Sequence, residues 1–534
     1  MSAAQVPAVG ETATTATAAT TWTGTWVADR LGIGVETVDA PVGVPLDALV
    51  GLAVRRNPRR AHLLVSTVLG KHVPTSPTVV HQAGVLLGHL VADVVAGSGT
   101  VPDAARAAGL ADALRDALGA TGPRTVAAAR RFADAVAASA PRAASGDPLH
   151  LLAGTAVLGY AETATALGHS VARALGVPSV HSTRRPVDGV TPAAGFAEEH
   201  SHATDHLVLP EDPRLLDRAS TLVLVDDEIS TGRTALNTIA ALDAVRHRER
   251  YVVAALIDLR SAADRGTFAA LSERLGVRID VVALASGTIT LPDGLLERAA
   301  SLVASVTATP VAPAGPSAPD AVPASAGPDG GARGLAPREV PTWGAGVRDG
   351  GRHGFTPADE TTLEAAATAA AESLRSSLTG DRVLVLGFEE LMYAPLLLGR
   401  ALESLASGTT GPGSAPGPAL EVRCSTTTRS PVLAVDEAGY ALRTTLEFPA
   451  HDDPADGPGP RFAHNVAPGT DPTRRFTDIV LVVDSVGDTP ELRAPGGLLD
   501  RLAESCDQVH LAVVPSYVPA QRTRTSPTTE EHTL

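Results

Sequence analysis

The sequence predicts an α/β protein with two parallel-sheet domains joined by a Pro/Gly-rich linker, and three features support this fold class. Short aliphatic runs alternate with helical patterns in both halves of the chain, as they do in strand–helix–strand units. A segment rich in Pro and Gly lies between the halves. The chain has 534 residues, of which 44% are hydrophobic and 19% charged, so it is long enough for several ordinary cores.

The first half contains aliphatic runs that we expect to form one parallel sheet, because helical patterns alternate with them. Apolar residues spaced three and four apart between about 84 and 138 predict further helices that cover one face of this sheet. The expected strands are 151–159, 221–225, 252–258 and 279–284, and the expected helices are 162–175 and 235–245.

The second half repeats this alternation and predicts a separate α/β domain, with strands at 382–386, 478–483 and 508–514 and a helix at 392–405. Between 309 and 337, seven Pro and five Gly in 29 residues leave too little apolar surface to offset the entropy of ordering. The expected organisation is a first domain at 23–308, a linker at 309–340, a second domain at 341–520, and disordered tails at 1–22 and 521–534.

The composition excludes several classes of partner. Acidic residues outnumber basic ones by 59 to 43, and the formal charge of −16 leaves no long positive surface for a nucleic-acid backbone. Two cysteines, Cys424 and Cys506, are too few for a disulfide framework or a cysteine zinc cage, which fits a reducing compartment. The sequence has no pattern typical of a signal peptide or a membrane span. We therefore expect a cytoplasmic protein without a nucleic-acid or membrane partner.

The most specific motif runs from Thr221 to Thr234. Four aliphatic residues predict a buried strand, and Asp226 and Asp227 stand at its carboxyl end, where open α/β sheets bind ligands. The turn 230–234 offers backbone N–H groups and hydroxyls at the start of a helix, which suits a phosphate monoester, and Gly232 lets the backbone approach closely. Two adjacent carboxylates suit the hydroxyls of a diol and a divalent cation. A phosphate and a vicinal diol together indicate ribose 5-phosphate.

This segment resembles the PRPP-binding signature of type I phosphoribosyltransferases, which implies their fold for the first domain. The resemblance implies that Asp226 and Asp227 hold the ribose hydroxyls and, through PRPP, a Mg²⁺ ion. Glu228, also a catalytic candidate, stands where the signature commonly has an aliphatic residue, and it leaves the class of base open. The alternative is a doubly wound strand ending in acids, as in response regulators. The residues implied to hold the 5-phosphate are Ser230, Thr231, Gly232, Arg233 and Thr234.

A second loop is a candidate for the pyrophosphate of PRPP. Residues 158–165 follow an aliphatic run and begin a helix, so their N–H groups are suited to a diphosphate, and type I enzymes have such a loop after their first strand. A plain strand-to-helix turn is the alternative. Lys71, the only lysine of the sequence, is a further candidate because a compact ammonium is retained there against an otherwise exclusive use of arginine, and chance survival of the lysine is the alternative. The pyrophosphate candidates are Gly159, Tyr160, Ala161, Glu162, Thr163 and Lys71.

Two polar clusters lie between these loops, at 181–185 and 196–206. Type I enzymes resemble one another in having a mobile hood here, which closes over PRPP and excludes water. Arg184, Arg185 and His200 would then meet the departing pyrophosphate. For the His200, His202 and His206 cluster, a structural metal site and a solvated polar loop are the other interpretations.

Further segments resemble the bacterial family that joins an orotate-phosphoribosyltransferase-like domain to a C-terminal TRSP domain: 57–60, 65–66, 69–74, 160–165, 198–202 and 428–431. The resemblance implies a place in tellurium-resistance-type stress gene clusters, which are thought to make a nucleoside-like metabolite. In the second domain, hydroxyls around one arginine fit either an anion site or a turn closed by hydroxyl-to-backbone bonds. The candidates there are Thr428, Arg429, Ser430, Glu389, Glu390 and Asn465.

These features predict a pentosyltransferase that transfers ribose 5-phosphate between PRPP and a nitrogenous base, pyrimidine-like or otherwise nucleobase-like, with pyrophosphate as the other partner. Mg²⁺ would arrive with PRPP, and catalysis would rest on positioning and charge stabilisation. A non-catalytic PRPP-binding regulator is the alternative, and the hood residues favour the enzyme because a sensor does not need them. The expected protein partners are a second copy of the chain or enzymes of the same pathway.

Overall fold

The structure, a computed structural model, describes the chain in ten segments. The tails expected at 1–22 and 521–534 lie outside them, as do His200, His202, residues 57–60 and the expected linker apart from 337–340. The described segments are 25–56, 61–97, 104–140, 152–198, 204–308, 337–340, 343–344, 346–406, 420–452 and 459–519.

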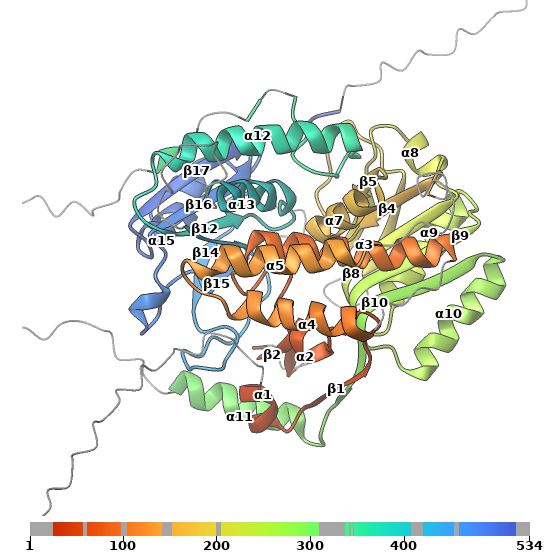
Figure 1. Cartoon of the computed structure of the whole chain (residues 1–534), viewed down its shortest axis with the longest axis horizontal. Coiled ribbons are helices and arrows are strands. Elements are labelled where there is room, and N and C mark those ends of the chain that lie inside the picture. The colour runs from red at the N-terminus through yellow and green to blue at the C-terminus, as the bar shows by residue number, and fades with distance from the viewer. Residues whose placement is uncertain are drawn as a thin grey trace, which may run out of the picture.

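The first domain is built on a six-stranded sheet in the order β1-β10-β9-β8-β4-β5 (Figure 1). The strands from β10 to β5 are parallel, and β1 runs antiparallel to β10. The central strands β4 and β9 are buried along almost their whole length, which explains their nearly continuous aliphatic sequences. The strands are β1 (Gly34–Asp39), β4 (Thr155–Gly159), β5 (Ser179–His181), β8 (Thr221–Ile229), β9 (Arg250–Asp258) and β10 (Arg278–Thr290).

Helices cover both faces of this sheet. α3 and α7 pack on one face, and α9 and α10 follow strands that progress across the sheet in the opposite direction, so right-handed crossovers place them on the other face. The helices are α3 (Pro77–Ala96), α4 (Ala104–Gly119), α5 (Arg124–Ala138), α7 (Thr165–Leu175), α9 (Arg233–Val245) and α10 (Ala262–Leu275).

Helix α3 has strong end signals and a largely buried length. Ser76 caps its first turn by accepting a hydrogen bond from Val79 N, Pro77 takes the first helical position, and Gly97 ends it with φ 67°. By length and composition alone α3 is able to cross a membrane, but 56% of its most apolar window is buried inside the protein, as expected for a core helix. It packs against α7, α5 and the sheet.

The remaining elements of the first domain lie around the sheet. β2 and β3 form one antiparallel hairpin, and β6 and β7 form another, which packs on α9. α1, β2, β3 and α11 share an apolar cluster with residues 432–442 of the second half. The elements are α1 (Thr25–Leu31), α2 (Leu46–Leu49), β2 (Val50–Val54), β3 (His62–Ser66), β6 (Ala194–Glu198), β7 (Thr204–Val208), α8 (Arg214–Asp217) and α11 (Leu295–Ala308).

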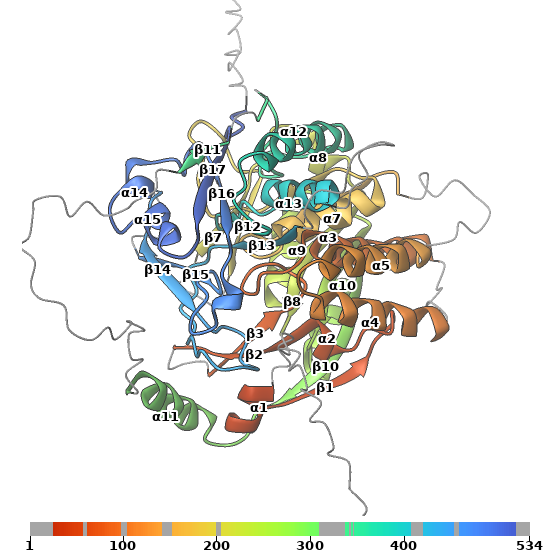
Figure 2. The same cartoon turned by 60° about the vertical axis from the view of Figure 1, so that its left-hand side comes forward.

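The second domain has a five-stranded parallel sheet in the order β11-β17-β16-β12-β13 (Figure 2). An antiparallel hairpin, β14–β15, follows β13. The elements are β11 (Arg338–Glu339), α12 (Pro357–Arg375), β12 (Arg382–Gly387), α13 (Tyr393–Ala406), β13 (Glu421–Thr426), β14 (Thr445–Pro449), β15 (Pro460–His464), η1 (Pro472–Arg474), β16 (Asp478–Asp484), α14 (Pro490–Arg493), α15 (Leu498–Ala503) and β17 (Gln508–Val514).

Several bounds differ from the sequence-based expectations, and three of the differences bear on the domains or on the site. β11 lies inside the expected linker 309–340 and pairs with β17, so the second domain begins at or before 338. β8 continues four residues beyond its expected end, which places the acids Asp226 and Asp227 within the strand. β13 was not expected because Glu421 and Arg423 interrupt its apolar run, and these two side chains pair with each other at 3.1 Å in a buried position.

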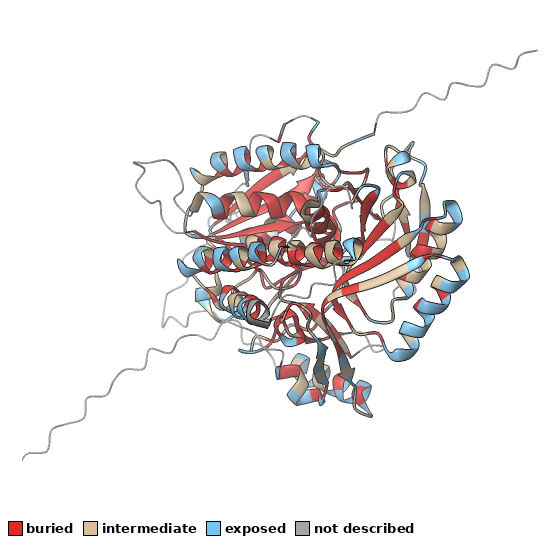
Figure 3. Ribbon diagram, turned by 45° about the vertical axis from the view of Figure 1, so that its right-hand side comes forward, coloured by how far each residue is buried: buried red, intermediate tan, exposed pale blue. Residues whose placement is uncertain are grey.

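The two halves are not separate bodies. Helix α3 of the first domain packs against α13 of the second as well as against α7. One apolar cluster joins Val80 and Ala166 of the first domain to Met392, Tyr393 and many other residues of the second. The buried residues, red in Figure 3, therefore run through both sheets and the helices between them, and exposed residues lie mainly on the outer helices.

Close packing of α3 on α7 leads to a test of the fold. A Cβ atom on Gly88 would lie 2.6 Å from the Ala174 Cβ, so Gly88→Ala forces the two helices apart, and we expect a loss of about 1–3 kcal/mol of stability. Gly109 of α4 has open space around it, so Gly109→Ala should instead gain about 0.5–1 kcal/mol from helix propensity. Thermal unfolding of both variants measures these effects, and equal shifts of the same sign would contradict the packing described.

Candidate functional site

Two loops of the first domain meet at the point where its strand order reverses. From β4 the chain crosses to β5 on one side, and from β8 it crosses to β9 on the other. In open α/β sheets the crevice at the carboxyl ends of two such strands is the usual ligand site. The segment 159–164 begins at the last residue of β4, and the segment 226–234 covers the end of β8 and the turn after it. The two segments that the sequence indicated therefore share this edge of the sheet.

The acid pair at the end of β8 is half-buried. The Asp226 Oδ1 accepts a hydrogen bond of 2.9 Å from the Asp227 backbone N–H. Burial and the neighbouring charge of Asp227 raise the pKa of Asp226 well above its usual range. Burial also raises the pKa of Asp227, and the Lys71 charge lowers it. Because the two carboxylates repel each other, the pair gains from a cation or from hydroxyl donors placed between them.

The turn after β8 is shaped for close approach. Gly232 has φ 78° and is the N-cap of α9, where it makes no side-chain capping bond, so the first N–H groups of this thirteen-residue helix are open to an anion. A Cβ at Gly232 would lie 2.4 Å from the ring of Phe268. The Oγ1 of Thr231 is buried and has no hydrogen-bond partner among the described residues. Ser230 and Arg233 are exposed, and Thr234 is half-buried.

The loop between β4 and α7 is held from two sides. A Cβ on Gly159 would lie 2.8 Å from the Ala164 carbonyl, so the tight turn requires glycine. The Ala161 N–H donates to the Ser182 Oγ at 2.9 Å, and this hydroxyl is 3.0 Å from His206 Nδ1. The Ala161–Glu162 peptide bond is cis. The Ala161 amide is therefore already occupied, whereas the other side of the loop faces Lys71.

Lys71 reaches this loop from a distant part of the chain. Its Nζ lies 3.5 Å from the Glu162 carboxylate and 3.4 Å from the Thr163 hydroxyl, and both charged side chains are about nine-tenths buried. Its charge also acts on Asp227. The lysine that the sequence singled out thus lies between the acid pair and the candidate diphosphate loop.

Of the three expected hood residues, the structure places Arg185 away from the candidate diphosphate loop. Arg185 points into the second domain, where its Nη2 is 2.6 Å from Asp452 and its Nη1 is 3.6 Å from Asp484, so it is not in contact with the candidate diphosphate loop. Arg184 is half-buried next to it. His200 lies outside the described ranges, and His206 supports the loop through Ser182. Among the residues that the structure describes, no group of three or more His, Cys, Asp or Glu is arranged to hold a metal ion.

The second domain brings its own carboxyl edge against the first. Glu389 and Glu390 follow β12, and Glu389 accepts hydrogen bonds from Arg429 (2.7 Å) and Arg461 (2.5 Å). Although burial raises it, the charge of Arg352 lowers the pKa of Glu390 to about 2. Asn465 donates to two backbone carbonyls, one of them in the first domain, and the Thr428 Oγ1 accepts a hydrogen bond of 3.2 Å from the Ser430 N–H. Of the second-domain candidates, therefore, Glu389, Glu390 and Arg429 belong to one cluster of charged side chains. The other members of this charged cluster are Arg185, Arg352, Asp452, Arg461 and Asp484.

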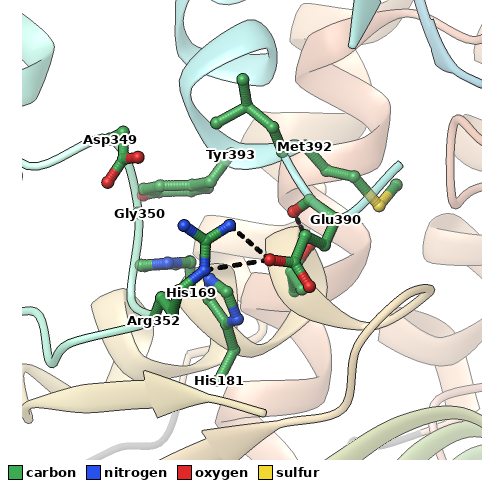
Figure 4. Close-up of a pocket in the computed structure, with 10 residues that line it drawn as sticks. His169, His181, Asp349, Gly350, Arg352, Glu390, Met392 and Tyr393 are labelled. Atoms are coloured by element: carbon green, nitrogen blue, oxygen red, sulfur yellow. Dashed lines mark hydrogen bonds and ion pairs between the residues drawn. The ribbon is translucent and has the colours of Figure 1, made fainter. Parts of the chain in front are cut away.

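A small polar cavity lies between the domains (Figure 4). It measures about 10 Å³, which is room for about one water molecule. His169 and His181 line it from the first domain, and Asp349, Arg352 and Glu390 line it from the second. Burial lowers the pKa of His181 to about 4, so its imidazole is neutral at neutral pH and keeps a single ring N–H, which donates from Nδ1 to the Ser182 carbonyl at 2.8 Å. This cavity has room for a water molecule or a very small ligand but not for a nucleotide.

Sequence reasoning missed several residues of the charged cluster. Asp484 ends β16 and was detectable as an acid at a strand tip, the same signal that revealed Asp226. Arg352, Asp452 and Arg461 belong to no motif. Packing of the domains brings Asp452 to Arg185, whereas the fold of the second domain brings Arg352 to Glu390 and Arg461 to Glu389.

Comparison with known families agrees with this arrangement. Residues 49–288 match the family described as phosphoribosyl transferase (PRTase_2), and residues 349–502 match the TRSP domain, described as C terminus to PRTase_2. These matches and the parallel sheet with its carboxyl-edge site define a phosphoribosyltransferase. The chain belongs to the family in which this transferase domain is followed by a TRSP domain.

The comparison with solved structures matches part of the chain to adenine phosphoribosyltransferases. Adenine phosphoribosyltransferase from Rhodothermus marinus is 24% identical over 24% of this chain and 68% of its own, with a TM-score of 0.17. The enzymes from Leishmania tarentolae and Trypanosoma brucei are each 20% identical over 24% of this chain, with TM-scores of 0.18. The chain spans 61% and 56% of their lengths, respectively. No curated protein matches the chain closely enough to count as a relative.

The inter-domain cavity provides a test by pH. Burial raises the pKa of Asp349 to about 6, above the usual 3.8, so the native state binds this proton more tightly and loses stability as pH rises from about 4 to 6. Asp349→Asn removes this loss, and we expect the variant to be about 3 kcal/mol more stable at pH 7.5 but only about 1 kcal/mol more stable at pH 4.5. Thermal unfolding at both pH values measures it. A gain that does not depend on pH would assign the effect to something other than this carboxyl group.

Proposed function

We propose that the protein transfers the 5-phosphoribosyl group between PRPP and a small nitrogenous base. The observation that supports this most strongly is the arrangement at the carboxyl ends of β4 and β8. A phosphate turn at 230–234, an acid pair at 226–227 and a loop facing Lys71 stand side by side there. This order matches the 5-phosphate, ribose and diphosphate of one PRPP molecule.

Different residues would bind the 5-phosphate, the ribose and the diphosphate of PRPP. The N–H groups at the start of α9 and the Thr231 hydroxyl, which has no partner among the described residues, would bind the 5-phosphate. Asp226 and Asp227 would accept hydrogen bonds from the ribose hydroxyls. Lys71 and the loop 159–163 would bind the diphosphate, so that PRPP is fixed at both ends with its C1 over the acid pair.

The reaction is a displacement at C1 of the ribose. The lone pair of a base nitrogen forms the new C1–N bond, the C1–O bond to pyrophosphate breaks, and its electron pair leaves with the pyrophosphate oxygen. The proton of the base nitrogen passes to solvent. Positive charge develops on the sugar during this step, and the carboxylates of Asp226 and Asp227 would stabilise it, whereas Lys71 would stabilise the negative leaving group.

Mg²⁺ fits the acid pair as a ligand that comes with PRPP. Two half-buried carboxylates whose pKa values are both raised gain from a cation, and their oxygens are suitable ligands for it. When bound, the ion would neutralise part of the diphosphate charge. Asp226 and Asp227 are the residues that would hold it, together with oxygens of PRPP.

The acceptor is proposed as a nucleobase-like ring. Aromatic residues make up only 3% of the chain, so recognition by hydrogen bonds is favoured over stacking between aromatic rings. A pyrimidine-like base and a role in a stress-response pathway of nucleoside-like metabolites are proposals that rest on the family resemblance alone. A cytoplasmic location is a proposal that rests on the two cysteines and the sequence pattern.

Replacing one acid tests the function. Asp227→Asn keeps the shape of the side chain but removes a charge that would stabilise the sugar cation, so we expect turnover to fall by at least about a hundredfold. The measurement is pyrophosphate release from Mg-PRPP in the presence of a panel of nitrogenous bases. Asp212→Asn is the matched control, because Asp212 is an exposed partner of Arg214 and should leave turnover unchanged.

The outcomes separate the candidate functions. If the wild-type chain binds Mg-PRPP but releases no pyrophosphate with any base, the protein is a PRPP-binding regulator and the transfer proposal is wrong. Unchanged turnover in Asp227→Asn would remove that residue from the reaction.

A further inference from the structure

The second domain has the same succession of elements as the core of the first. In each, a first strand (β4 or β12) leads through a helix (α7 or α13) to a second strand (β5 or β13) at its side. An antiparallel hairpin follows (β6–β7 or β14–β15), and the third strand (β8 or β16) returns to the other side of the first. A fourth strand (β9 or β17) lies beyond it, so the strand orders β9-β8-β4-β5 and β17-β16-β12-β13 coincide.

The backbone hydrogen bonds coincide as well. Gly159, the last residue of β4, accepts a bond of 3.0 Å from the Ser182 N–H just after β5. Gly387, the last residue of β12, accepts a bond of 3.2 Å from the Thr427 N–H just after β13. A Cβ on either glycine would meet a carbonyl oxygen of its own loop, at 2.8 Å in the first domain and 2.5 Å in the second.

The next residue in each domain contacts the following hairpin through the same pair of backbone hydrogen bonds. Thr183 exchanges two backbone hydrogen bonds, of 2.9 and 2.8 Å, with Leu207 of β7. Thr428 exchanges two, of 2.9 and 2.8 Å, with Phe462 of β15. These contacts make Thr428 the counterpart of Thr183, and the next residue, Arg429, the counterpart of Arg184.

The sequences agree with this structural register. Residues 157–162 read VLGYAE and residues 385–390 read VLGFEE. Residues 183–186 read TRRP and residues 428–431 read TRSP. In the third strands, Leu158 pairs with Leu224 and Leu386 pairs with Leu481, and 223–227 (VLVDD) then aligns with 480–484 (VLVVD). Glu390 is thus the counterpart of Glu162, and Asp484 that of Asp227.

The second core has lost the part that would bind a 5-phosphate. Val483 stands at the position of Asp226, and Asp484 accepts a hydrogen bond from the Gly487 N–H at 2.9 Å, which closes the turn on itself. The following helix α14 has only four residues, and Thr489 already caps it. A second sugar-phosphate site is therefore not expected in this domain.

Each core inserts the loop after its second strand into the crevice of the other. Thr183 donates to the Glu390 carboxylate at 2.9 Å, and Arg185 lies 3.6 Å from Asp484, so the first core fills the altered site of the second. In the opposite direction, the Arg429 Nε lies 3.9 Å from the Glu162 Oε1. Contacts between the loops and crevices of the two cores therefore run in both directions.

Glu162 therefore sits between two cations from different domains. Its Oε2 is 3.5 Å from Lys71, and its buried Oε1 faces Arg429 without a hydrogen bond to any described residue. A carboxylate held this loosely between two cations occupies the place that suits an incoming anion. A diphosphate on the loop 159–163 would compete with it for both side chains.

We propose that residues 338–514 are a divergent second copy of the phosphoribosyltransferase core and that this copy supplies Arg429 to the diphosphate subsite of the first core. The inference rests on the proposed function, because it assigns a ligand to Arg429 in the same site. It makes the chain an internal pair of cores with one sugar-phosphate site, which only the docked second core completes.

The test compares two fragments of PRPP, ribose 5-phosphate and Mg-pyrophosphate, in calorimetric titrations of the full chain. Arg429→Ala should weaken Mg-pyrophosphate binding by about tenfold to a hundredfold and leave ribose 5-phosphate binding within twofold. Thr231→Val should do the reverse. If Arg429→Ala does not fold, Arg429→Lys and Arg429→Gln are compared in the same way, and we expect the charged variant to bind Mg-pyrophosphate more tightly.

Arg348→Ala is the matched control. Arg348 is as buried as Arg429, and it also crosses between the domains, where it pairs with Glu211, but it does not contact the diphosphate loop. The Arg348→Ala variant should bind both ribose 5-phosphate and Mg-pyrophosphate as the wild type does. Equal losses for both fragments in Arg429→Ala, or no loss, would overturn the inference while leaving the proposed function intact. If the wild type binds neither fragment, the proposed function fails, and the inference fails with it.

Discussion

The structure depends on the neutralisation of buried charges where two parallel sheets meet with their carboxyl ends face to face. Arg185 extends from the first domain, and the acids that neutralise it, Asp452 and Asp484, belong to the second. Glu389 in turn accepts bonds from two arginines of its own domain. Removing one partner of such a buried pair leaves an unpaired charge and costs about 3–5 kcal/mol. The pairing of Arg185 therefore depends on the docking of the two domains.

Because some of these charges are paired only across the two domains, the sequence predicts one part of the site and not the rest. The acids and the phosphate turn at 226–234 are contiguous, so their chemistry is visible in the sequence and the structure places them at one sheet edge. Lys71 was identified only as an unusual residue, and the fold gives it a position beside Glu162. The place of Arg185 was not predictable, because its partners are more than 260 positions away and no local pattern indicates which loop meets which.

The fold was predictable where strands are wholly apolar and less so where they carry charges. β17 has the expected bounds, and β12 and β16 differ by one residue. The sequence did not predict β13, because Glu421 and Arg423 neutralise each other inside the sheet and give a buried strand a polar sequence. The sequence did not reveal the similarity of the two cores, because the matching segments are not separated by a constant number of residues. The segments that match are short, and the loops between them differ in length.

The central claim is that one PRPP molecule lies across the carboxyl ends of β4 and β8. A crystal structure of the full chain with Mg²⁺ and PRPP tests it most directly. The account predicts the 5-phosphate on the turn 230–234, the ribose hydroxyls on Asp226 and Asp227, and the diphosphate between the loop 159–163, Lys71 and Arg429. A ligand bound elsewhere, or the same site empty at a saturating concentration of Mg-PRPP, would contradict it.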